Sequence, residues 1–321
     1  MSRSEIVDET ATRIKVEDGR LVFENYNSFY ETLNNLRLNR NKTRNLPEDT
    51  AGFNSLGSEF AKVSLLIGDS EVSSETNDLL SFGFPEEFLL VLNKEGEVQI
   101  GNEIIWYQNH NKFFISTADK DKLKEFKKNT DLVHKRVPAG SQVVDLNFNN
   151  NSGVAVENLT YLGYGGSLDA RHQREFVSQA PVHGRRKYVH EIITFFDGYY
   201  NTGTHLIWST YITLRIKLEW KGSKWRPASE LRNINVSLSG TASVNTPGQG
   251  TYQLGPTINT NQSVQRNNDY LVPLAQFNGS GTLPGNARWQ LNMWGTIYHH
   301  IVGDVTSNQW YNAGTSSNPL W

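Results

Sequence analysis

The chain contains no cysteine in its 321 residues. This absence excludes disulfide bonds, thiolate nucleophiles, zinc knuckles and cysteine-held iron–sulfur clusters. No run of about 18 apolar residues occurs either, so the sequence predicts no helix that spans a membrane. The formal net charge is only −2. Such a small charge gives no long-range attraction to nucleic acid or to an anionic membrane, and we predict neither as a direct partner.

Metal-binding and catalytic motifs are absent as well. The eight histidines include no HExxH and no His-x-His spacing. His299 and His300 lie in an alternating segment, where adjacent side chains point to opposite faces. The glycines of Gly163–Arg171 are not followed by the lysine of a phosphate-binding loop, and no GxSxG occurs. The sequence therefore predicts no metal site, no cofactor and no catalytic residue.

Composition changes sharply near Pro138. Residues 1–137 contain 23 acidic and 18 basic residues but only 7 of the 26 glycines, whereas residues 138–321 contain 10 acidic and 13 basic residues and seven of the eight tryptophans. A shift of this kind is typical of a domain boundary. We expect a flexible leader or tether over 1–12, an α+β N-terminal region over 13–137 and a second domain over 138–321.

Local patterns in the first region indicate short strands and helices. Asp18–Gly19 is a hairpin-turn pair between two β-type runs, and Gly101–Asn102 separates two more. Apolar residues at helical spacing indicate helices at 27–38, 52–68, 85–93 and 117–129.

The second region consists of alternating segments. Leu206–Trp220 keeps its apolar residues on one side, and at fifteen residues it is long enough that we expect a bulge or bend within it. Ala287–Gly303 carries large residues on both sides, which predicts a strand covered on both faces. With Gly- and Asn-rich turns and no helical pattern between them, these segments predict a mainly β protein. We expect an antiparallel β-sandwich-like C-terminal domain preceded by a smaller α+β N-terminal region.

An ordered set of short motifs marks the N-terminal half: Asp18–Phe23, Phe29, Leu92–Asn93, Gly96–Gly101 and Trp106–Ile115. This pattern resembles a group of secreted lipoproteins of unknown function from Bacteroidota. The resemblance implies an extracellular or outer-membrane location and a structural role for the motifs. It also implies a lipid-modified cysteine, which this chain lacks; Ser2–Thr10 is similar to the polar tether that follows such a cysteine.

Two clusters of aromatic and amide residues are candidate binding sites. Both are predicted in Gly- and Asn-rich turns, where an exposed ring can stack on a sugar while amides donate and accept hydrogen bonds. Anchoring of loops explains the same rings. The candidate residues are Tyr199, Tyr200, Asn201, Trp310, Tyr311 and Asn312.

Charged residues of the β-rich part allow two further hypotheses. Glu191, Asp197 and Glu219 are the carboxylates available to a glycosidase, which needs a close pair of them. Basic residues gather in two places, and these are Arg185, Arg186 and Lys187, and the series Arg215, Lys217, Lys221, Lys224 and Arg226. Arg215, Lys217 and Lys221 share one strand face with Glu219, which indicates cross-strand ion pairs on a solvated face or, alternatively, a patch for an anionic glycan or nucleic acid.

These observations favour a non-enzymatic, secreted or surface-anchored bacterial module that binds a glycan or protein partner or has a structural role. A carbohydrate-active hydrolase on a β-sandwich is the alternative. A β-pore-forming toxin is a third hypothesis, because the Ser- and Thr-rich segment Asn235–Val264 resembles the hairpins that such toxins insert.

Overall fold

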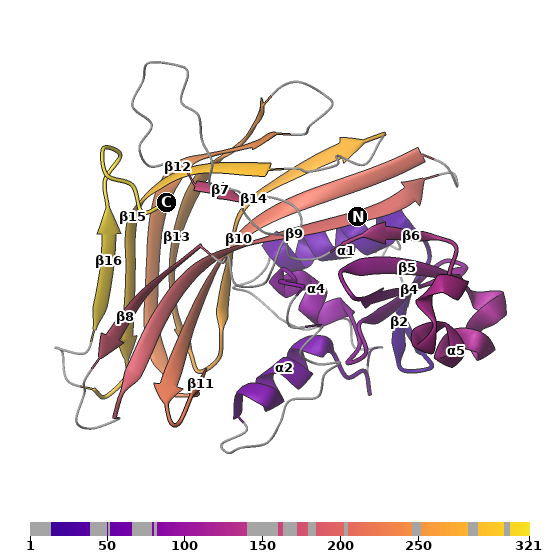
Figure 1. Ribbon diagram of the computed structural model, residues 1–321, viewed down its shortest axis with the longest axis horizontal. Coiled ribbons are helices and arrows are strands. Elements are labelled where there is room, and N and C mark those ends of the chain that lie inside the picture. Colours follow the sequence, from indigo (N-terminus) through magenta and orange to yellow (C-terminus); the bar gives the residue numbers. More distant parts are fainter. Residues whose placement is uncertain are drawn as a thin grey trace, which may run out of the picture. The chain divides into compact units, whose positions relative to one another are not determined.

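A computed structural model shows a mainly β protein with few and short helices (Figure 1). It describes residues 14–38, 50, 52–65, 79, 82–139, 160–162, 172–178, 184–201, 205–245, 252–281, 288–304 and 309–321. The predicted leader over 1–12 lies outside these residues.

Two compact units make up the chain. The first comprises 1–59, 86–108 and 112–136, and the second comprises 60–85, 109–111 and 137–321. The last stretch begins one residue before the predicted boundary at 138, and two earlier segments of the chain also belong to the second unit.

The N-terminal part forms a six-stranded sheet in the order β1-β2-β3-β4-β5-β6. Its strands are Lys15–Glu17, Arg20–Phe23, Glu97–Ile100, Glu103–Gln108, Asn111–Ser116 and Arg136–Pro138. The helices are α1 (Tyr26–Leu38), α2 (Leu56–Leu65), α4 (Glu86–Val91) and α5 (Leu123–Lys128), with 3₁₀ turns η2 (Thr117–Lys122) and η3 (Thr130–Leu132). The predicted turn at Asp18–Gly19 is confirmed, since both residues have positive φ, 49° and 75°, as a tight hairpin turn requires.

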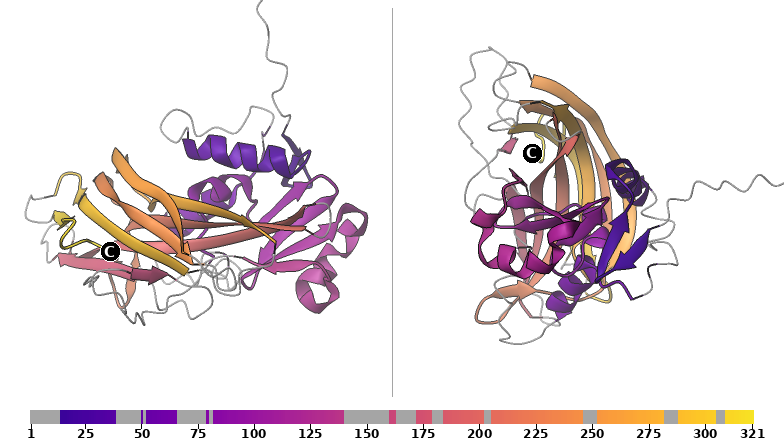
Figure 2. Two further views of the ribbon diagram at one scale, coloured as in Figure 1. Left: turned by 90° about the horizontal axis from the view of Figure 1, so that it is seen from above. Right: turned by 90° about the vertical axis from the view of Figure 1, so that its right-hand side faces the viewer.

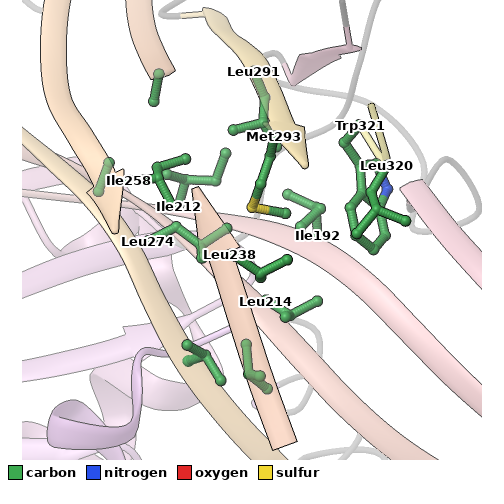
Figure 3. Packing of buried hydrophobic residues seen from close by; sticks show 14 of the residues in the cluster. Ile192, Ile212, Leu214, Leu238, Ile258, Leu274, Leu291, Met293, Leu320 and Trp321 are labelled. Atoms are coloured by element: carbon green, nitrogen blue, oxygen red, sulfur yellow. The ribbon is translucent and has the colours of Figure 1, made fainter. Parts of the chain in front are cut away.

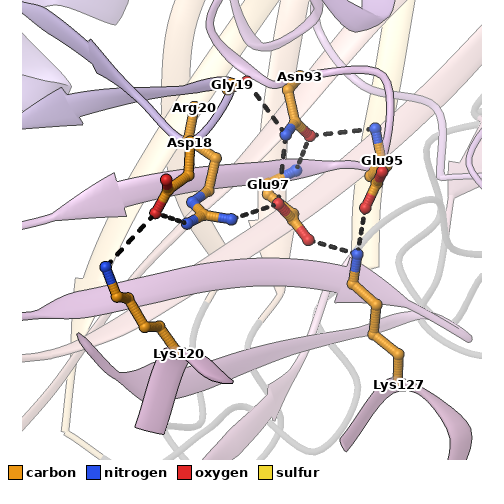
Figure 4. Close-up of polar contacts among 8 residues, drawn as sticks. All are labelled: Asp18, Gly19, Arg20, Asn93, Glu95, Glu97, Lys120 and Lys127. Atoms are coloured by element: carbon orange, nitrogen blue, oxygen red, sulfur yellow. Dashed lines mark hydrogen bonds and ion pairs between the residues drawn. The ribbon is translucent and has the colours of Figure 1, made fainter. Parts of the chain in front are cut away.

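Residues of the N-terminal motifs contact one another in a buried polar network (Figure 4). Arg20 Nη1 donates to Glu97 Oε2 at 3.1 Å, and Asn93 Nδ2 donates to the same oxygen at 3.2 Å. Asn93 also accepts the backbone N–H of Glu97 at 2.8 Å. Lys127 forms ion pairs with Glu95 and Glu97. The network joins the β1–β2 hairpin to the turn before β3, so its role in the fold is structural.

Two long sheets form the β-rich part, and their strongly twisted strands are visible in Figures 1 and 2. The β10 sheet has the order β11-β10-β9-β8, with β14 also paired to β10. The β12 sheet has the order β13-β12-β15-β16, with β7 paired to β15. Strands of the β10 sheet are β8 (His172–Ser178), β9 (Arg186–Asn201), β10 (His205–Lys221), β11 (Trp225–Pro227) and β14 (Tyr270–Ser280). Strands of the β12 sheet are β7 (Thr160–Leu162), β12 (Arg232–Asn245), β13 (Tyr252–Arg266), β15 (Arg288–Ile301) and β16 (Trp310–Gly314).

The hydrophobic core lies between the inner faces of these two sheets (Figure 3). Ile212 and Leu214 of β10 pack in one cluster with Leu238 of β12 and Met293 of β15. Trp289 Nε1 donates a buried hydrogen bond of 2.9 Å to Thr210 Oγ1 of the opposite sheet. The C-terminal Leu320 is held beside β15 by a hydrogen bond from its backbone N–H to Met293 O. Two antiparallel sheets that share one core form a sandwich, as predicted.

Strand β10 spans 17 residues without a break. Its pairing with β9 is continuous, but its register with β14 shifts between Ile212 and Thr213. The irregularity expected somewhere within 206–220 is therefore a register shift against one neighbour and does not interrupt the strand. The side of β10 opposite Ile212 and Leu214 is not fully exposed to solvent, because Tyr211 and Thr213 on that side are buried. Phe195 of β9 lies beside Tyr211 and contacts the ring of Phe84 at 5.2 Å between centroids, so an earlier segment of unit 2 covers this end of the sheet.

The prediction that β15 is covered on both faces is wrong. Trp289, Leu291, Met293 and Ile297 are buried, but Trp294 and Tyr298 on the other side are only half-buried. The large residues on this outer side therefore lie at a surface, where they are able to meet a ligand.

Candidate functional site

The outer face of the β12 sheet carries rows of uncharged hydrogen-bonding side chains. Asn235, Ser237, Ser239 and Thr241 of β12 are exposed and lie opposite exposed residues of β13 in the register of the sheet. Two cross-strand hydrogen bonds link the strands: Ser263 Oγ donates to Asn235 Oδ1 at 2.6 Å, and Gln265 Nε2 donates to Asn233 Oδ1 at 2.8 Å. The remaining hydroxyl and amide groups point to solvent.

Aromatic rings flank these rows on the neighbouring strands. Tyr298 of β15 lies opposite Asn235 on one side and Tyr311 of β16 on the other. Tyr311 is 62% exposed, the highest exposure of any large aromatic side chain in the described residues. Trp294 lies opposite Ser239, so the half-buried indole borders the same surface.

We call this surface the polar face. Its residues are Asn233, Asn235, Ser237, Ser239, Thr241, Thr257, Asn259, Asn261, Ser263, Gln265, Asn292, Trp294, Thr296, Tyr298, His300, Tyr311 and Ala313. It includes no Asp, Glu, Lys or Arg. Side chains two apart on a strand are about 6.7 Å apart and neighbouring strands about 4.8 Å apart, so the face offers a regular grid of donors and acceptors. Such a grid suits an uncharged polyhydroxyl ligand.

The six predicted site residues do not lie in turns and do not form one site. Tyr199, Tyr200 and Asn201 end strand β9, whereas Trp310, Tyr311 and Asn312 lie in β16. Trp310 stacks on His190, nine residues before Tyr199, and nine strand residues extend about 30 Å. The turn prediction was wrong because both segments continue the alternation of their strands. Of the six, Tyr311 alone belongs to the polar face.

Trp310 and Asn312 instead point into the sandwich, where they contact a buried histidine cluster. The Trp310 ring stacks on His190 at 3.9 Å, and Asn312 Nδ2 donates to His190 Nδ1 at 3.2 Å. His299 lies parallel to His190 at 5.6 Å, and Tyr188 meets His299 edge-on. The cluster comprises Tyr188, His190, Arg232, His299, Trp310 and Asn312.

Electrostatics in this cluster keep both histidines neutral. Burial lowers the pKa of His190 well below its ordinary value. Burial also lowers the pKa of His299 well below its usual range, and the nearby Arg232 cation adds to the effect. Arg232 is fully buried and donates to His299 Nε2 at 3.4 Å and to the backbone oxygen of Asn268. Within the described residues no carboxylate forms an ion pair with Arg232, so a proton on His299 would lie beside a second cation.

Two of the three carboxylates considered for hydrolysis, Glu191 and Glu219, are unsuited to that task, and the third, Asp197, is fully buried in β9. Glu191 is fully buried and forms ion pairs with Arg215 and Lys217. Glu219 is held by Lys187 at 2.7 Å and by Lys217 at 3.3 Å. An acid that protonates a glycosidic oxygen has to reach its substrate, whereas ion pairs hold these two carboxylates on neighbouring cations.

These contacts confirm the predicted cross-strand ion pairs on the outer face of the β10 sheet. Arg215 lies opposite Glu191, and Glu219 lies opposite Lys187 in the register of β9 and β10. The side chains are only 13 to 17% exposed, apart from the fully buried Glu191, so the face is less solvated than expected.

Two classes of feature are missing from the described residues. No group of three or more His, Asp or Glu side chains there has the arrangement to hold a metal ion. None of the helices that the structure describes has the length and apolar character needed to cross a membrane.

Sequence reasoning missed the histidine cluster and most of the polar face. His190 and His299 are 109 positions apart, and only the packing of the two sheets brings them together. The polar residues of β12 alternate with apolar residues along the sequence, but their neighbours on β13, β15 and β16 follow from strand order, which the sequence does not state.

Comparisons with known proteins give little further information. No family model matches the chain, and no curated protein matches it. The chain is similar to a solved structure, a DUF4848 family protein from Bacteroides thetaiotaomicron VPI-5482, with 14% sequence identity and a TM-score of 0.20 over 93% of this chain and 98% of that chain. Likeness at this level does not extend to ligands or sites.

Proposed function

We propose that this protein is a non-enzymatic binding module that recognises an uncharged glycan through the polar face. The observation that carries the proposal is the combination on one exposed sheet face of hydroxyl and amide rows with the rings of Tyr298 and Tyr311. We also propose a secreted or surface-anchored location, which the resemblance to secreted lipoproteins supports.

The chemistry of the polar face matches that of a neutral sugar chain. Sugar hydroxyls both donate and accept, as Asn, Ser, Thr and Gln side chains do. The apolar face of a sugar ring packs on an aromatic ring, and an exposed tyrosine loses little rotamer entropy when it is covered. A face without charged groups avoids the cost of desolvating ions on binding.

A hydrolase is disfavoured by the ion pairs of Glu191 and Glu219, and the polar face contains no carboxylate within the described residues. The apolar side of β12, which the pore-forming hypothesis requires for membrane insertion, is buried in the sandwich core. Both alternatives nevertheless predict distinct results in the experiment below.

The test is binding of the full chain to an array of neutral and charged glycans, followed by titration of the best neutral ligand. We expect Tyr311→Ala to weaken that binding by about tenfold, because the most exposed ring of the face is lost. Tyr199→Ala, in the other sheet, is the matched control and leaves binding unchanged.

Three results would overturn the proposal: no neutral ligand on the array, equal loss in the two tyrosine variants, or release of sugar that Glu191→Gln or Glu219→Gln abolishes. The last result would establish the hydrolase. Leakage of liposomes by heat-stable oligomers would establish the pore-forming alternative.

A further inference from the structure

A group of cations surrounds one indole at an end of the β10 sheet. Trp225 of β11 lies opposite Lys221 of β10, and the backbone N–H of Lys221 donates to the carbonyl of Arg185 at 3.0 Å. Arg185, Lys187 and Lys221 lie 5.5, 4.9 and 5.4 Å from the centre of the Trp225 ring. We call these four residues the Trp225 cluster.

Charge is unbalanced in this cluster but balanced along the rest of the same face. Lys187 is neutralised by Glu219 at 2.7 Å and by Glu175 at 3.6 Å. Arg185 and Lys221 are exposed, and no carboxylate in the described part of the chain forms an ion pair with them. Farther along β9 and β10, Arg215 forms an ion pair with Glu191 and Lys217 forms one with Glu219. The surplus positive charge therefore lies at the tryptophan.

We propose that the Trp225 cluster is a second binding site, for a sugar chain that bears sulfate, phosphate or carboxylate groups. A guanidinium and two ammonium groups donate charge-assisted hydrogen bonds to the oxygens of such a group. The indole between them offers an apolar surface to the adjoining sugar ring. An anion also relieves the repulsion between Arg185 and Lys221, the two cations of the cluster that are not neutralised by a carboxylate of the described residues.

The limited extent of the cluster favours a glycan over the two other polyanions. Nucleic acid is held by neutralising many phosphates along a continuous path, but the face beyond the cluster is charge-balanced. Membrane surfaces are bound by basic residues together with inserted apolar side chains. Of the large hydrophobic residues that the structure shows exposed, none lies in 185–187 or 220–226.

This inference shares with the proposed function only the premise that the ligand is a sugar chain, since the two sites lie on different sheets. The test compares dextran sulfate with unmodified dextran, which differ only in the sulfate groups. We expect the full chain to bind dextran sulfate in low salt and to lose affinity as ionic strength rises. Arg185→Gln with Lys221→Gln weakens binding by about tenfold, and Trp225→Ala gives a loss of similar size.

The matched control is Lys124→Gln with Lys128→Gln, which removes two positive charges from α5 and leaves binding unchanged. Tyr311→Ala also leaves dextran sulfate binding unchanged, so failure of the polar face and failure of the Trp225 cluster are distinguishable. Circular dichroism verifies that each variant is folded. Equal losses in the cluster and control variants would overturn the inference. So would the absence of binding, or equal affinity for single-stranded DNA or for anionic phospholipid vesicles.

Discussion

Single residues inside the sandwich show how burial changes chemistry. His190 and His299 are fully buried, and each keeps one ring nitrogen without a hydrogen-bond partner. Both pKa values are lowered because burial disfavours the charged imidazolium. The folded protein therefore holds two neutral histidines at a pH at which exposed histidines take up protons.

Acid is expected to destabilise the protein through this pair. Above about pH 6.5 a histidine is neutral in the folded and the unfolded chain alike; below it, only the unfolded chain binds the proton, so unfolding becomes more favourable. We expect each buried histidine to lower the free energy of unfolding by about 1.4 kcal/mol for each pH unit below 6.5, until the pH reaches the lowered pKa of that histidine in the folded chain. Urea unfolding at pH 7.5, 6.5 and 5.5 measures this slope.

Substitution separates the pair from other titrating groups. His190→Gln with His299→Gln is expected to flatten the dependence on pH, whatever its effect on the stability itself. His205→Gln changes an exposed histidine and preserves the wild-type slope. A double variant with an unchanged slope would show that other groups cause the acid sensitivity.

Among the elements, β12 depends on a close approach to β15. Gly240 lies opposite Met293, and a Cβ at Gly240 would overlap the carbonyl oxygen of Asn292 and lie 2.8 Å from the Met293 Cα. Gly295 of β15 has a φ of 124°, which side chains rarely adopt, and a Cβ there would overlap the carbonyl of Ser237. The two glycines allow these strands to pair at the centre of the sheet.

Gly240→Ala is therefore expected to destabilise the protein by about 2–3 kcal/mol, because the strands must move apart to admit the methyl group. The midpoint of urea unfolding measures the effect. Ser239→Ala, one residue away on the exposed side, is the control, and its free energy of unfolding is expected to stay within about 0.5 kcal/mol of that of the wild type. Equal stability of the Gly240→Ala variant and the wild type would contradict the close approach.

At the scale of the whole molecule, unit 2 is assembled from segments far apart in the chain. Phe82 stacks on Phe84 and on His110, and Phe84 contacts Phe195 of β9. All of these residues belong to unit 2. The covered side of the β10 sheet therefore requires residues that precede 138.

Phe84→Ala is expected to cost about 3–5 kcal/mol of unfolding free energy, the usual range for removing a buried phenylalanine ring. Tryptophan fluorescence during urea unfolding reports the transition of the sandwich, where seven of the eight tryptophans lie beyond residue 138. Leu132→Ala removes an exposed apolar side chain and serves as the control. A Phe84→Ala variant as stable as that control would show that the sandwich does not need the earlier segment.

The sequence by itself determined the local elements and the class of fold. Two-residue alternation along 206–220 identified that strand and its buried apolar side, because side chains of a strand alternate between faces. The Asp18–Gly19 turn and the helix at 27–38 followed from equally local rules. The sequence also predicted that Arg215 and Lys217 form cross-strand ion pairs with acidic residues, but it did not identify Glu191 of β9 as their partner.

Tertiary structure decided which of these residues meet. Periodicity specifies the side of a strand but not its neighbours, so the polar face, the His190–His299 contact and the cation group around Trp225 depend on strand order and register. The same limit explains why Trp310 and Asn312 were assigned to a turn: they face the core because β16 pairs with β15. Contacts between distant strands form through burial of apolar surface, which depends on the whole chain rather than on any local segment.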